Sequence, residues 1–506
     1  MVNYSYKEKN MKLSKILSLV VSAAAIFTLA SCDKTPAETT ASPDVTNTEV
    51  VEDIGIPTTA DFGGGEFFIL TAGSVAYEDF TVEEESSLPL DNARYKLLSK
   101  VEEDYNVDII QDVMVGYSSA SSGTPGKGYT TITQNVNSGE CQYDLALVAG
   151  YDVSQLASTS YLYDLNSVKG ENGGIDLTKS WWDQNAVDSL SIRDVTFFTT
   201  GEITTSDNDA AFVIIFNKKL AEDYQIEDPY ELVKSGKWTI DKLSEISKLV
   251  SEDLNQDGIM GLDDRFGLLI WDDSVVGIVN AAGERCCVIN DKGELELTFY
   301  NETTVAALED YFAIAYDNEH AIRYQRVVTS TEQERAFWQA DHGLFWTTWM
   351  GQIPALREME SDFGILPYPK LTVAQEEYYS TIAPYNSQYI CVPLIQNDVE
   401  RTGIITEALA YYGQKTITPV YYDINLTGQS LRDEESEEML DIIFGNLVYD
   451  IGYCYQIGTY NKQLIIMLRA SNENITSVYD TYKMSAERQL AIINASYERA
   501  VAEWVK

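Results

Sequence analysis

The stretch 211–267 constrains the fold more than any other part of the sequence. It opens on an apolar run at 212–216, which predicts a strand, and it later contains a helical pattern of apolar residues. Thr239 precedes this pattern, and its hydroxyl is placed to cap the first amides of the helix. The apolar side of the helix is formed by Ile240, Leu243, Ile246 and Leu249. The helix leads directly into a polar loop, so a strand, a helix and a loop are expected within one short stretch.

This loop has the pattern of a calcium loop, because side-chain oxygens alternate around a glycine at the sixth place. The expected ligands are the side chains of Asp253, Asn255, Asp257 and Asp264 and the carbonyl of Ile259. Asp264 is one methylene shorter than the usual glutamate, so ligation there is looser or shared with Asp263. A single loop without a paired partner is a poor sensor, so we expect a structural Ca²⁺. An acidic surface turn without an ion is the alternative.

Several short phrases follow one another in order along the chain. They are Tyr143–Leu145, Trp181–Asp183, Phe216–Leu220, Asp228–Pro229, Gly236–Thr239, Phe266–Gly267, Asp362–Pro367 and Arg432–Asp433. Their order resembles the extracellular solute-binding proteins of bacterial ABC importers, and most of all the carbohydrate-type, family 1-like lipoproteins of Gram-positive bacteria. The resemblance extends from about Asp61 to near the C-terminus. It implies an α/β fold of two lobes, the periplasmic-binding-protein-like fold of type II, with a ligand cleft between the lobes.

The resemblance also implies how the lobes divide the chain. The expected parts are lobe 1 at 61–205, lobe 2 at 206–384 with the calcium-type loop 253–264, a return to lobe 1 at 385–425, and lobe 2 again at 426–506. The polar run 201–209 resembles a hinge strand and part of the cleft wall. An ordinary surface loop is the alternative for this run.

The first part of the folded chain has the pattern of a strand–helix–strand unit followed by a further strand. The elements are expected at 66–70, 92–105, 107–110 and 143–149. Such units build parallel sheets, and residues just past the carboxyl ends of parallel strands face the ligand crevice. Thr71, after the first strand, and Tyr151 and Asp152, after the last, are therefore candidate ligand-binding residues.

Aromatic and acidic residues gather at two later strands. Trp271 and Asp272 follow an apolar run, and Trp346 and Trp349 lie three residues apart in another. Flat indole rings match the C–H faces of a sugar ring, while nearby carboxylates accept its hydroxyls. We therefore expect these four residues, together with Asp209 of the hinge run, to bind a carbohydrate.

The N-terminal residues are typical of a lipoprotein export signal. Lysines precede an uncharged apolar stretch at 16–30, which is too short to span a bilayer. Small residues precede Cys32, which resembles a lipobox, where the thiol is acylated and the chain is cut before it. We expect a lipoprotein signal peptide at 1–32, a disordered tether at 33–60, and a protein held by lipid on the extracellular face of the cell membrane. A buried cysteine after a cleaved signal is the alternative, and Met11 is an alternative start.

Charge and motif content narrow the class of function. The chain has 79 acidic and 35 basic residues, a formal net charge of -44, so it repels the phosphates of nucleic acids. Neither of the two histidines lies in HExxH, and GxSxG does not occur, so these two hydrolase classes are not expected. A glycoside hydrolase needs only a carboxylate pair and stays an alternative, as does a receptor for peptides or another small solute. The main hypothesis is non-enzymatic, a receptor that binds a sugar or oligosaccharide and delivers it to an ABC permease.

Overall fold

The structure is a computed structural model, and it describes residues 53–118, 124–323, 330–356, 359–426 and 434–504. The chain divides into two units, 1–53 and 54–506, and every described helix and strand belongs to the second unit. The predicted signal peptide with its Cys32, and the predicted tether up to residue 52, lie outside the described residues. Among the described helices, none is both long and apolar enough to cross a membrane.

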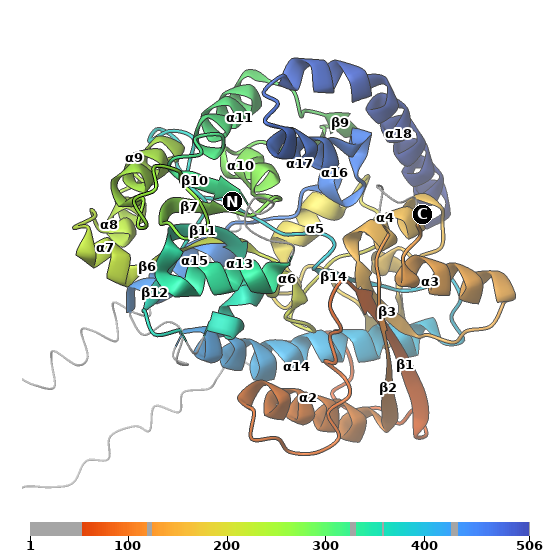
Figure 1. The fold of residues 1–506 in the computed structure, drawn as a ribbon. Helices are drawn as coiled ribbons and strands as arrows, with labels where there is room; N and C mark the ends of the chain where they lie inside the picture. The colour runs from red at the N-terminus through yellow and green to blue at the C-terminus, as the bar shows by residue number, and fades with distance from the viewer. Residues whose placement is uncertain (1–52, 119–123, 324–329, 357–358, 427–433, 505–506) are drawn as a thin grey trace, which may run out of the picture. The chain divides into compact units, whose positions relative to one another are not determined.

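The first sheet of the second unit has the strand order β14-β3-β1-β2. Its strands are β1 (Gly65–Gly73), β2 (Val107–Val115), β3 (Leu145–Ala149) and β14 (Gln388–Cys391). β1 runs parallel to β2 and β3, and β14 is antiparallel to β3. Helices α2 (Pro89–Tyr105) and α3 (Lys127–Ser138) make the crossovers that parallel neighbours require. The predicted strand–helix–strand unit is therefore confirmed. A long helix, α14 (Val399–Leu426), packs beside α2 (Figure 1).

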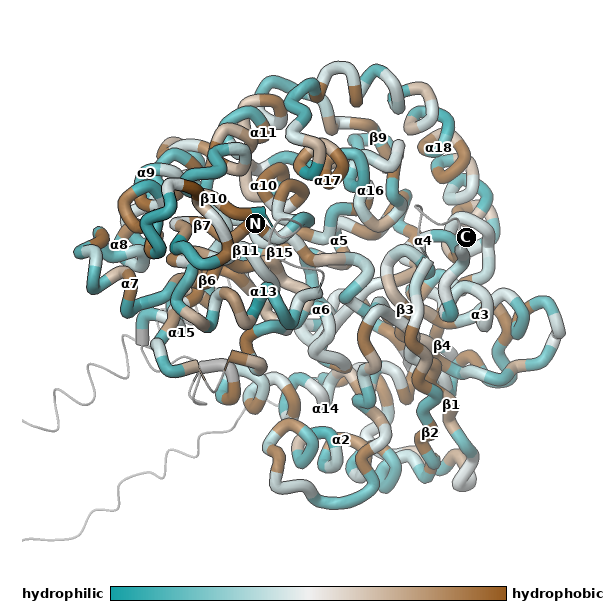
Figure 2. The backbone as a smooth tube through the Cα atoms, viewed as in Figure 1, coloured by the Kyte–Doolittle hydropathy of each residue, from teal (hydrophilic) through white to brown (hydrophobic). Residues whose placement is uncertain are grey.

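The second sheet has the strand order β10-β7-β11-β6-β12. Its strands are β6 (Phe212–Asn217), β7 (Phe266–Ile270), β10 (Ala321–Arg323), β11 (Gly343–Trp349) and β12 (Phe363–Leu366). β7 is parallel to β10 and β11, whereas β6 is antiparallel to both of its neighbours. Every residue of β6 and β7 is buried, which agrees with their apolar sequences and with the brown colour of these strands in Figure 2.

Further helices and short strands complete the second unit. The helices are α4 (Gly150–Ser158), α5 (Gln184–Leu190), α6 (Ser206–Asp209), α7 (Lys218–Asp223), α8 (Pro229–Lys234), α9 (Ile240–Val250), α10 (Ser274–Ala281), α11 (Glu302–Ala315), α13 (Thr331–Phe337), α15 (Glu434–Gly445), α16 (Ile451–Cys454), α17 (Tyr460–Ala470), α18 (Ile475–Trp504) and the short 3₁₀ helices η1 (Leu165–Ser167), η3 (Met350–Leu356) and η4 (Ile457–Thr459). The short strands are β4 (Lys169–Gly170), β5 (Gly173–Gly174), β8 (Cys287–Ile289), β9 (Leu295–Leu297), β13 (Ser380–Thr381) and β15 (Leu447–Val448). We call the first sheet with α2, α3, α4 and α14 the first lobe, and the second sheet with α7 to α11, α13 and α15 to α18 the second lobe.

Helix α9 begins where the sequence predicts it. The Thr239 hydroxyl accepts a hydrogen bond from the amide of Lys242 at 3.3 Å, as a capping side chain does. Leu243 and Ile246 are buried as expected. Leu249 is exposed instead, and Val250 is buried in its place, because the buried side of the helix shifts by one residue in its last turn.

Two segments that connect the sheets lie side by side. Thr199 forms an antiparallel bridge with Ile390, a residue of β14 in the first sheet. Ala211 forms a second bridge with Ile382, immediately before β6 of the second sheet begins. The run 201–209, predicted as a hinge strand, lies between these two bridges and leads from one sheet to the other. The lobe boundaries expected from the resemblance stay predictions.

The predicted disorder of the tether 33–60 is wrong for residues 54–57, because these residues pack against the first lobe. Ile54 and Ile56 are buried in the core of the first lobe. The Tyr105 hydroxyl donates a hydrogen bond to the carbonyl of Pro57 at 2.7 Å. Two apolar side chains and a buried hydroxyl are therefore enough to fix a segment whose overall composition predicts disorder.

Candidate functional site

Four tyrosine rings from both lobes meet at the connecting segments, and we call them the tyrosine cluster. The rings belong to Tyr117 after β2, Tyr151 in the first turn of α4, Tyr385 in a connecting segment and Tyr453 in α16. Their neighbouring centroids lie 5.5 to 6.2 Å apart. The side-chain amide of Asn461 in α17 donates to the Tyr151 hydroxyl at 3.1 Å, so the predicted residue Tyr151 contacts the second lobe. Tyr117 is 37% exposed, which leaves one edge of the tyrosine cluster open to solvent.

Asp273 is the acidic centre of the tyrosine cluster. It accepts hydrogen bonds from the hydroxyls of Tyr385 at 2.6 Å and Tyr453 at 3.3 Å. Burial raises the pKa of Asp273 to about 6, and the neighbouring charge of Asp272 adds to this rise. Sequence reasoning missed Asp273, although the position after β7 that selected Asp272 applies to it equally. Nothing in the local sequence pointed to Tyr385 or Tyr453.

Trp271, two residues before Asp273 in the sequence, forms an aromatic pair with Trp349. Their ring centroids lie 4.7 Å apart, and an edge contact with Phe212 at 4.9 Å holds Trp271 from the other side. Trp271 is 9% exposed, whereas Trp349 is only half-buried at the end of β11. The structure therefore brings these two predicted residues together and leaves part of the Trp349 ring open to a ligand.

Asp272, also a predicted site residue, follows Trp271 directly and forms an ion pair with Arg469. The Arg469 guanidinium of α17 donates from Nε and Nη2 to one carboxylate oxygen, at 3.0 and 2.6 Å. Asp272 is nearly buried, while the Arg469 side chain is half exposed. A ligand at this place meets both a carboxylate and a guanidinium, which suits hydroxyl groups that donate and accept hydrogen bonds. No local sequence pattern pointed to Arg469, which lies far along the chain.

Trp346 does not lie at this site. Its ring is fully buried and packs against Trp338 at 5.9 Å between centroids. Successive side chains of a strand point to opposite faces, so residues three apart, such as Trp346 and Trp349, lie on different sides of the sheet. The structure therefore does not bring the predicted residue Trp346 together with Trp349.

Thr71 and Asp152 are buried inside the first lobe. β1 continues to Gly73, so Thr71 is not at its end, and the Thr71 hydroxyl accepts a hydrogen bond from Gln111 at 2.8 Å. Asp152 accepts hydrogen bonds from the amides of Ser118 at 2.6 Å and Tyr129 at 3.2 Å. The structure thus places Asp152 where it fixes the segment that carries Tyr117, and it places neither residue among the tyrosine and tryptophan rings.

Asp209 lies at the end of the hinge run. It accepts hydrogen bonds from the hydroxyls of Tyr77, after β1, at 3.2 Å and of Tyr421, in α14, at 2.9 Å. Burial raises the pKa of Asp209 to about 6. Gly351, next to Trp349, approaches its backbone, because a Cβ at Gly351 would lie 3.3 Å from the Asp209 carbonyl and 3.1 Å from the Trp349 ring nitrogen. Asp209 therefore joins the connecting segments to the rim of the aromatic pair.

The calcium-type loop 253–264 turns its acidic side chains onto its own backbone. Asp253 accepts hydrogen bonds from the amides of Gln256 and Gly258 at 2.7 and 2.8 Å. Asn255 and Asp257 each accept one from the amide two residues on, at 2.8 Å. Asp264 is fully buried and accepts two more, at 3.0 and 2.7 Å.

The donor set of this loop fits a hard cation. All of its predicted side-chain ligands carry oxygen, and each is held by an amide of the loop itself. Gly258 has a φ of 79°, the left-handed conformation that the sharp turn requires. An antiparallel bridge between Glu252 and Arg265 closes the loop at its base.

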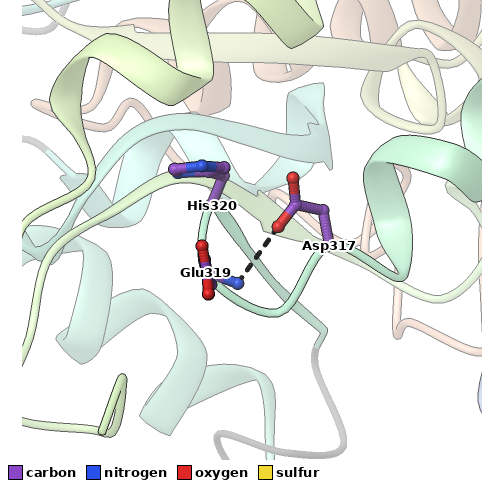
Figure 3. A group of neighbouring side chains, drawn as sticks. All are labelled: Asp317, Glu319 and His320. Atoms are coloured by element: carbon purple, nitrogen blue, oxygen red, sulfur yellow. Dashed lines mark hydrogen bonds between the residues drawn. The ribbon is translucent and has the colours of Figure 1, made fainter. Parts of the chain in front are cut away.

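A second acidic group lies at the turn between α11 and β10. Figure 3 shows Asp317, Glu319 and His320 at this turn. One ligand atom of each residue lies within 4.8 Å of those of the other two. The amide of Glu319 donates to Asp317 at 3.2 Å. The carbonyl of His320 also accepts from the amide of Gly267 at 3.1 Å, which shows a structural role for this turn. Exposed acids often gather without an ion, and we assign no metal to this group.

Comparison with known proteins shows similarity of fold at low sequence identity. No protein-family model matches the sequence, and no curated protein matches it. The structure is similar to an ABC substrate-binding protein from Listeria monocytogenes in complex with cycloalternan, with a TM-score of 0.54 and 12% identity, over 83% of this chain and 98% of that one.

Two further solved structures are similar over nearly their whole length. The maltose/maltodextrin-binding domain MalE from Bdellovibrio bacteriovorus, bound to maltotriose, has a TM-score of 0.52 and 12% identity, over 84% of this chain and 100% of that one. A family 1 extracellular solute-binding protein from Bifidobacterium longum subsp. infantis has a TM-score of 0.51 and 14% identity, over 86% and 100%. The α/β two-lobe, periplasmic-binding-protein-like fold that the sequence resemblance implies is thereby confirmed.

Proposed function

We propose that this protein is the lipid-anchored substrate-binding component of an ABC importer, which captures a sugar or oligosaccharide between its lobes. One observation carries the proposal: the half-buried ring of Trp349 packs against Trp271, the residue before Asp272, and the Asp272 carboxylate pairs with Arg469. Solved structures of similar fold are complexes with cycloalternan and with maltotriose. The permease, the anchor at Cys32 and the extracellular location belong to the proposal.

The site chemistry suits a neutral ring bearing hydroxyls. The apolar face of a sugar stacks on the Trp349 ring, while its hydroxyls bond to Asp272 and Arg469. Tyr117 and Tyr151 of the first lobe complete the site from the opposite side. A ligand that touches both lobes favours the closed arrangement over an open one, because it has contacts in the closed form that it lacks in the open form.

Isothermal titration against a panel of neutral glycans, peptides and amino acids tests this function. We expect saturable binding of at least one glycan and no release of reducing sugar when the same mixture is incubated. Reducing-sugar release without a stable complex would instead support the glycoside hydrolase alternative. Binding of peptides alone would support the small-solute alternative.

We also propose that the loop 253–264 holds a structural Ca²⁺ through Asp253, Asn255, Asp257, Asp264 and the carbonyl of Ile259. The oxygen donors of these side chains and the left-handed turn at Gly258 support it. Tb³⁺ luminescence, excited through nearby aromatic rings and displaced by Ca²⁺, tests the site directly. We expect the signal to disappear in Asp253→Asn and to persist in Asp317→Asn, which alters the acidic group of Figure 3.

A further inference from the structure

A cavity of about 350 Å³ lies between the lobes, apart from the tryptophan pair. The first lobe contributes α4 together with Ser118, Thr124 and Pro125, and the second lobe contributes η4 and α18. This volume is within the range of small-molecule sites in proteins. We call it the α4–α18 groove.

The lining of the α4–α18 groove is uncharged and combines apolar surface with polar groups. None of the described side chains that line it carries a formal charge, and Pro125, Tyr455, Ile492 and Ile493 supply apolar surface. Its polar side chains include Ser118, Ser154, Gln155, Gln456, Thr459 and Gln489. In a chain with a formal charge of -44 an uncharged groove is a notable local property. It suits a neutral ligand that both donates and accepts hydrogen bonds, and it offers no cation for a phosphate or a carboxylate.

The second-lobe wall of the groove is held in an unusual backbone conformation. Gln456 and Thr459 have φ values of 50° and 55°, and Gly458 between them has 57°. A β-branched residue such as threonine seldom adopts a positive φ, and such strain persists where the surrounding structure fixes it, often at ligand sites. Both strained residues line the groove.

Hydrogen bonds between the walls preform the groove. The Ser154 hydroxyl of α4 donates to the carbonyl of Cys454 at 2.9 Å, which joins the first lobe to the second. The side chain of Gln489 donates to the carbonyl of Tyr455 at 2.7 Å and accepts from the amide of Gly458 at 3.2 Å. These bonds fix η4 against α18, so a ligand meets polar groups that are already in place.

The groove adjoins the site described above along one helix. Tyr151, in the first turn of α4, belongs to the tyrosine cluster, and Gln155 and Ser158 follow about one and two turns later. Two helical turns span roughly 11 Å, about the length of two linked sugar rings. On the other segment Tyr117 of the tyrosine cluster is followed directly by Ser118 of the groove.

From this geometry we infer that the α4–α18 groove is a second subsite, which takes the further units of a neutral glycan whose first unit lies at Trp349. The inference rests on the proposed carbohydrate binding and names its substrate class: an uncharged oligosaccharide of three or more units. Because the groove has walls from both lobes, each further unit adds contacts that hold the lobes together.

Titration calorimetry with neutral glycans of increasing length tests the subsite. The probes are the linear series of α-1,4-glucans, β-1,4-glucans and β-1,4-xylans, from the monosaccharide upward. In the wild-type protein we expect affinity in at least one series to rise at the third unit. In the double variant Gln155→Ala/Gln456→Ala that gain should fall about tenfold, while the mono- and disaccharides bind as in the wild type. Ser158→Trp, which fills the groove without removing a bond between its walls, should give the same pattern.

The outcomes separate this inference from the function on which it rests. If the wild type binds no glycan, the carbohydrate function itself fails. If it binds glycans but its affinity does not grow with length, or the groove variants bind every length as the wild type does, only the second subsite is overturned. An equal loss at every length also overturns it, because it would mark a structural role. Hydrogen exchange supplies an independent readout, in which the longest bound glycan should protect amides of η4 and the disaccharide should not.

Discussion

Two groups of acids show how differently this chain holds carboxylates. We call the region of the tyrosine cluster, the connecting segments and the Trp271–Trp349 pair the seam. There, Asp273 and Asp209 accept hydrogen bonds from tyrosine hydroxyls that come from distant parts of the chain. In the loop 253–264, Asp253 and Asp264 accept from amides within the same loop. The loop therefore keeps its arrangement whatever the lobes do, whereas the seam exists only while both lobes and the connecting segments are together. We infer that the seam responds to ligand and pH, and that the loop responds to cations alone.

The largest expected effect is that of removing the Ca²⁺ that we propose in the loop 253–264. Chelation with EGTA should lower the stability of the folded protein by about 3–4 kcal/mol relative to saturating Ca²⁺, as for a ligand present at several hundred times its dissociation constant. Differential scanning calorimetry in EGTA and in Ca²⁺ measures this. Glycan affinity measured below the melting temperature should stay the same. A large loss of glycan affinity in EGTA would show that loop and seam are coupled and would break the comparison.

The next effect is on the seam. Trp349→Ala should weaken glycan binding by about 2–3 kcal/mol, the usual cost of losing a large buried apolar contact, with little change in melting temperature. Trp346→Phe is the matched control, because Trp346 lies in the core on the other face of the same strand. Calorimetric titration of both variants compares them. Equal affinities for Trp349→Ala and the wild type would place the ligand elsewhere.

Titration of Asp273 gives a smaller effect. The pKa of Asp273 in the folded protein is raised to about 6, above its ordinary value of 3.8, so its contribution to stability is largest in acid and falls as pH rises through 6. Asp273→Asn keeps an oxygen for the two tyrosine hydroxyls and removes the charge. Relative to the wild type, the variant should therefore gain roughly 2 kcal/mol of stability between pH 4.5 and pH 8. Urea unfolding at both pH values measures this, and parallel pH profiles would contradict it.

The smallest effect is at the helix that leads into the loop. Thr239→Ala removes the hydroxyl that caps α9 and should cost about 1 kcal/mol of unfolding free energy. Thr239→Ser keeps the hydroxyl and should retain most of the stability. Neither change should alter glycan affinity, since α9 lies away from the seam, and chemical denaturation of the three proteins ranks them. A loss as large in the serine variant would assign the effect to the lost methyl group instead of the cap.

The sequence predicts local features well, because their parts are neighbours in the chain. The cap at Thr239 and the strands β6 and β7 are found where their patterns place them. The pairing of Trp271 with Trp349 could be expected only through the idea that strand ends meet at one edge of a sheet. The same reasoning selected Trp346 wrongly, because a spacing of three on a strand changes the face.

The rest of the site could not be predicted from one sequence. Tyr385, Tyr453 and Arg469 reach the site from a connecting segment, a one-turn helix and the far end of α17, and their local sequences carry no signal for it. Thr71 was selected because the first strand was expected to end at Leu70. The strand continues to Gly73, where pairing with β2 still extends, so only the tertiary partner sets its true end.

Two of the segments that connect the lobes, around 199–211 and 382–390, are bridged to each other, and this affects how the lobes can move. Since bridges pin the two connecting segments together at Thr199–Ile390 and again at Ala211–Ile382, they act as one stiff strip and not as two independent tethers. We expect rotation about this strip to be the main motion between the lobes. Distances measured between spin labels, one on each lobe, should then fall into two discrete populations, one with and one without ligand, in place of a broad distribution.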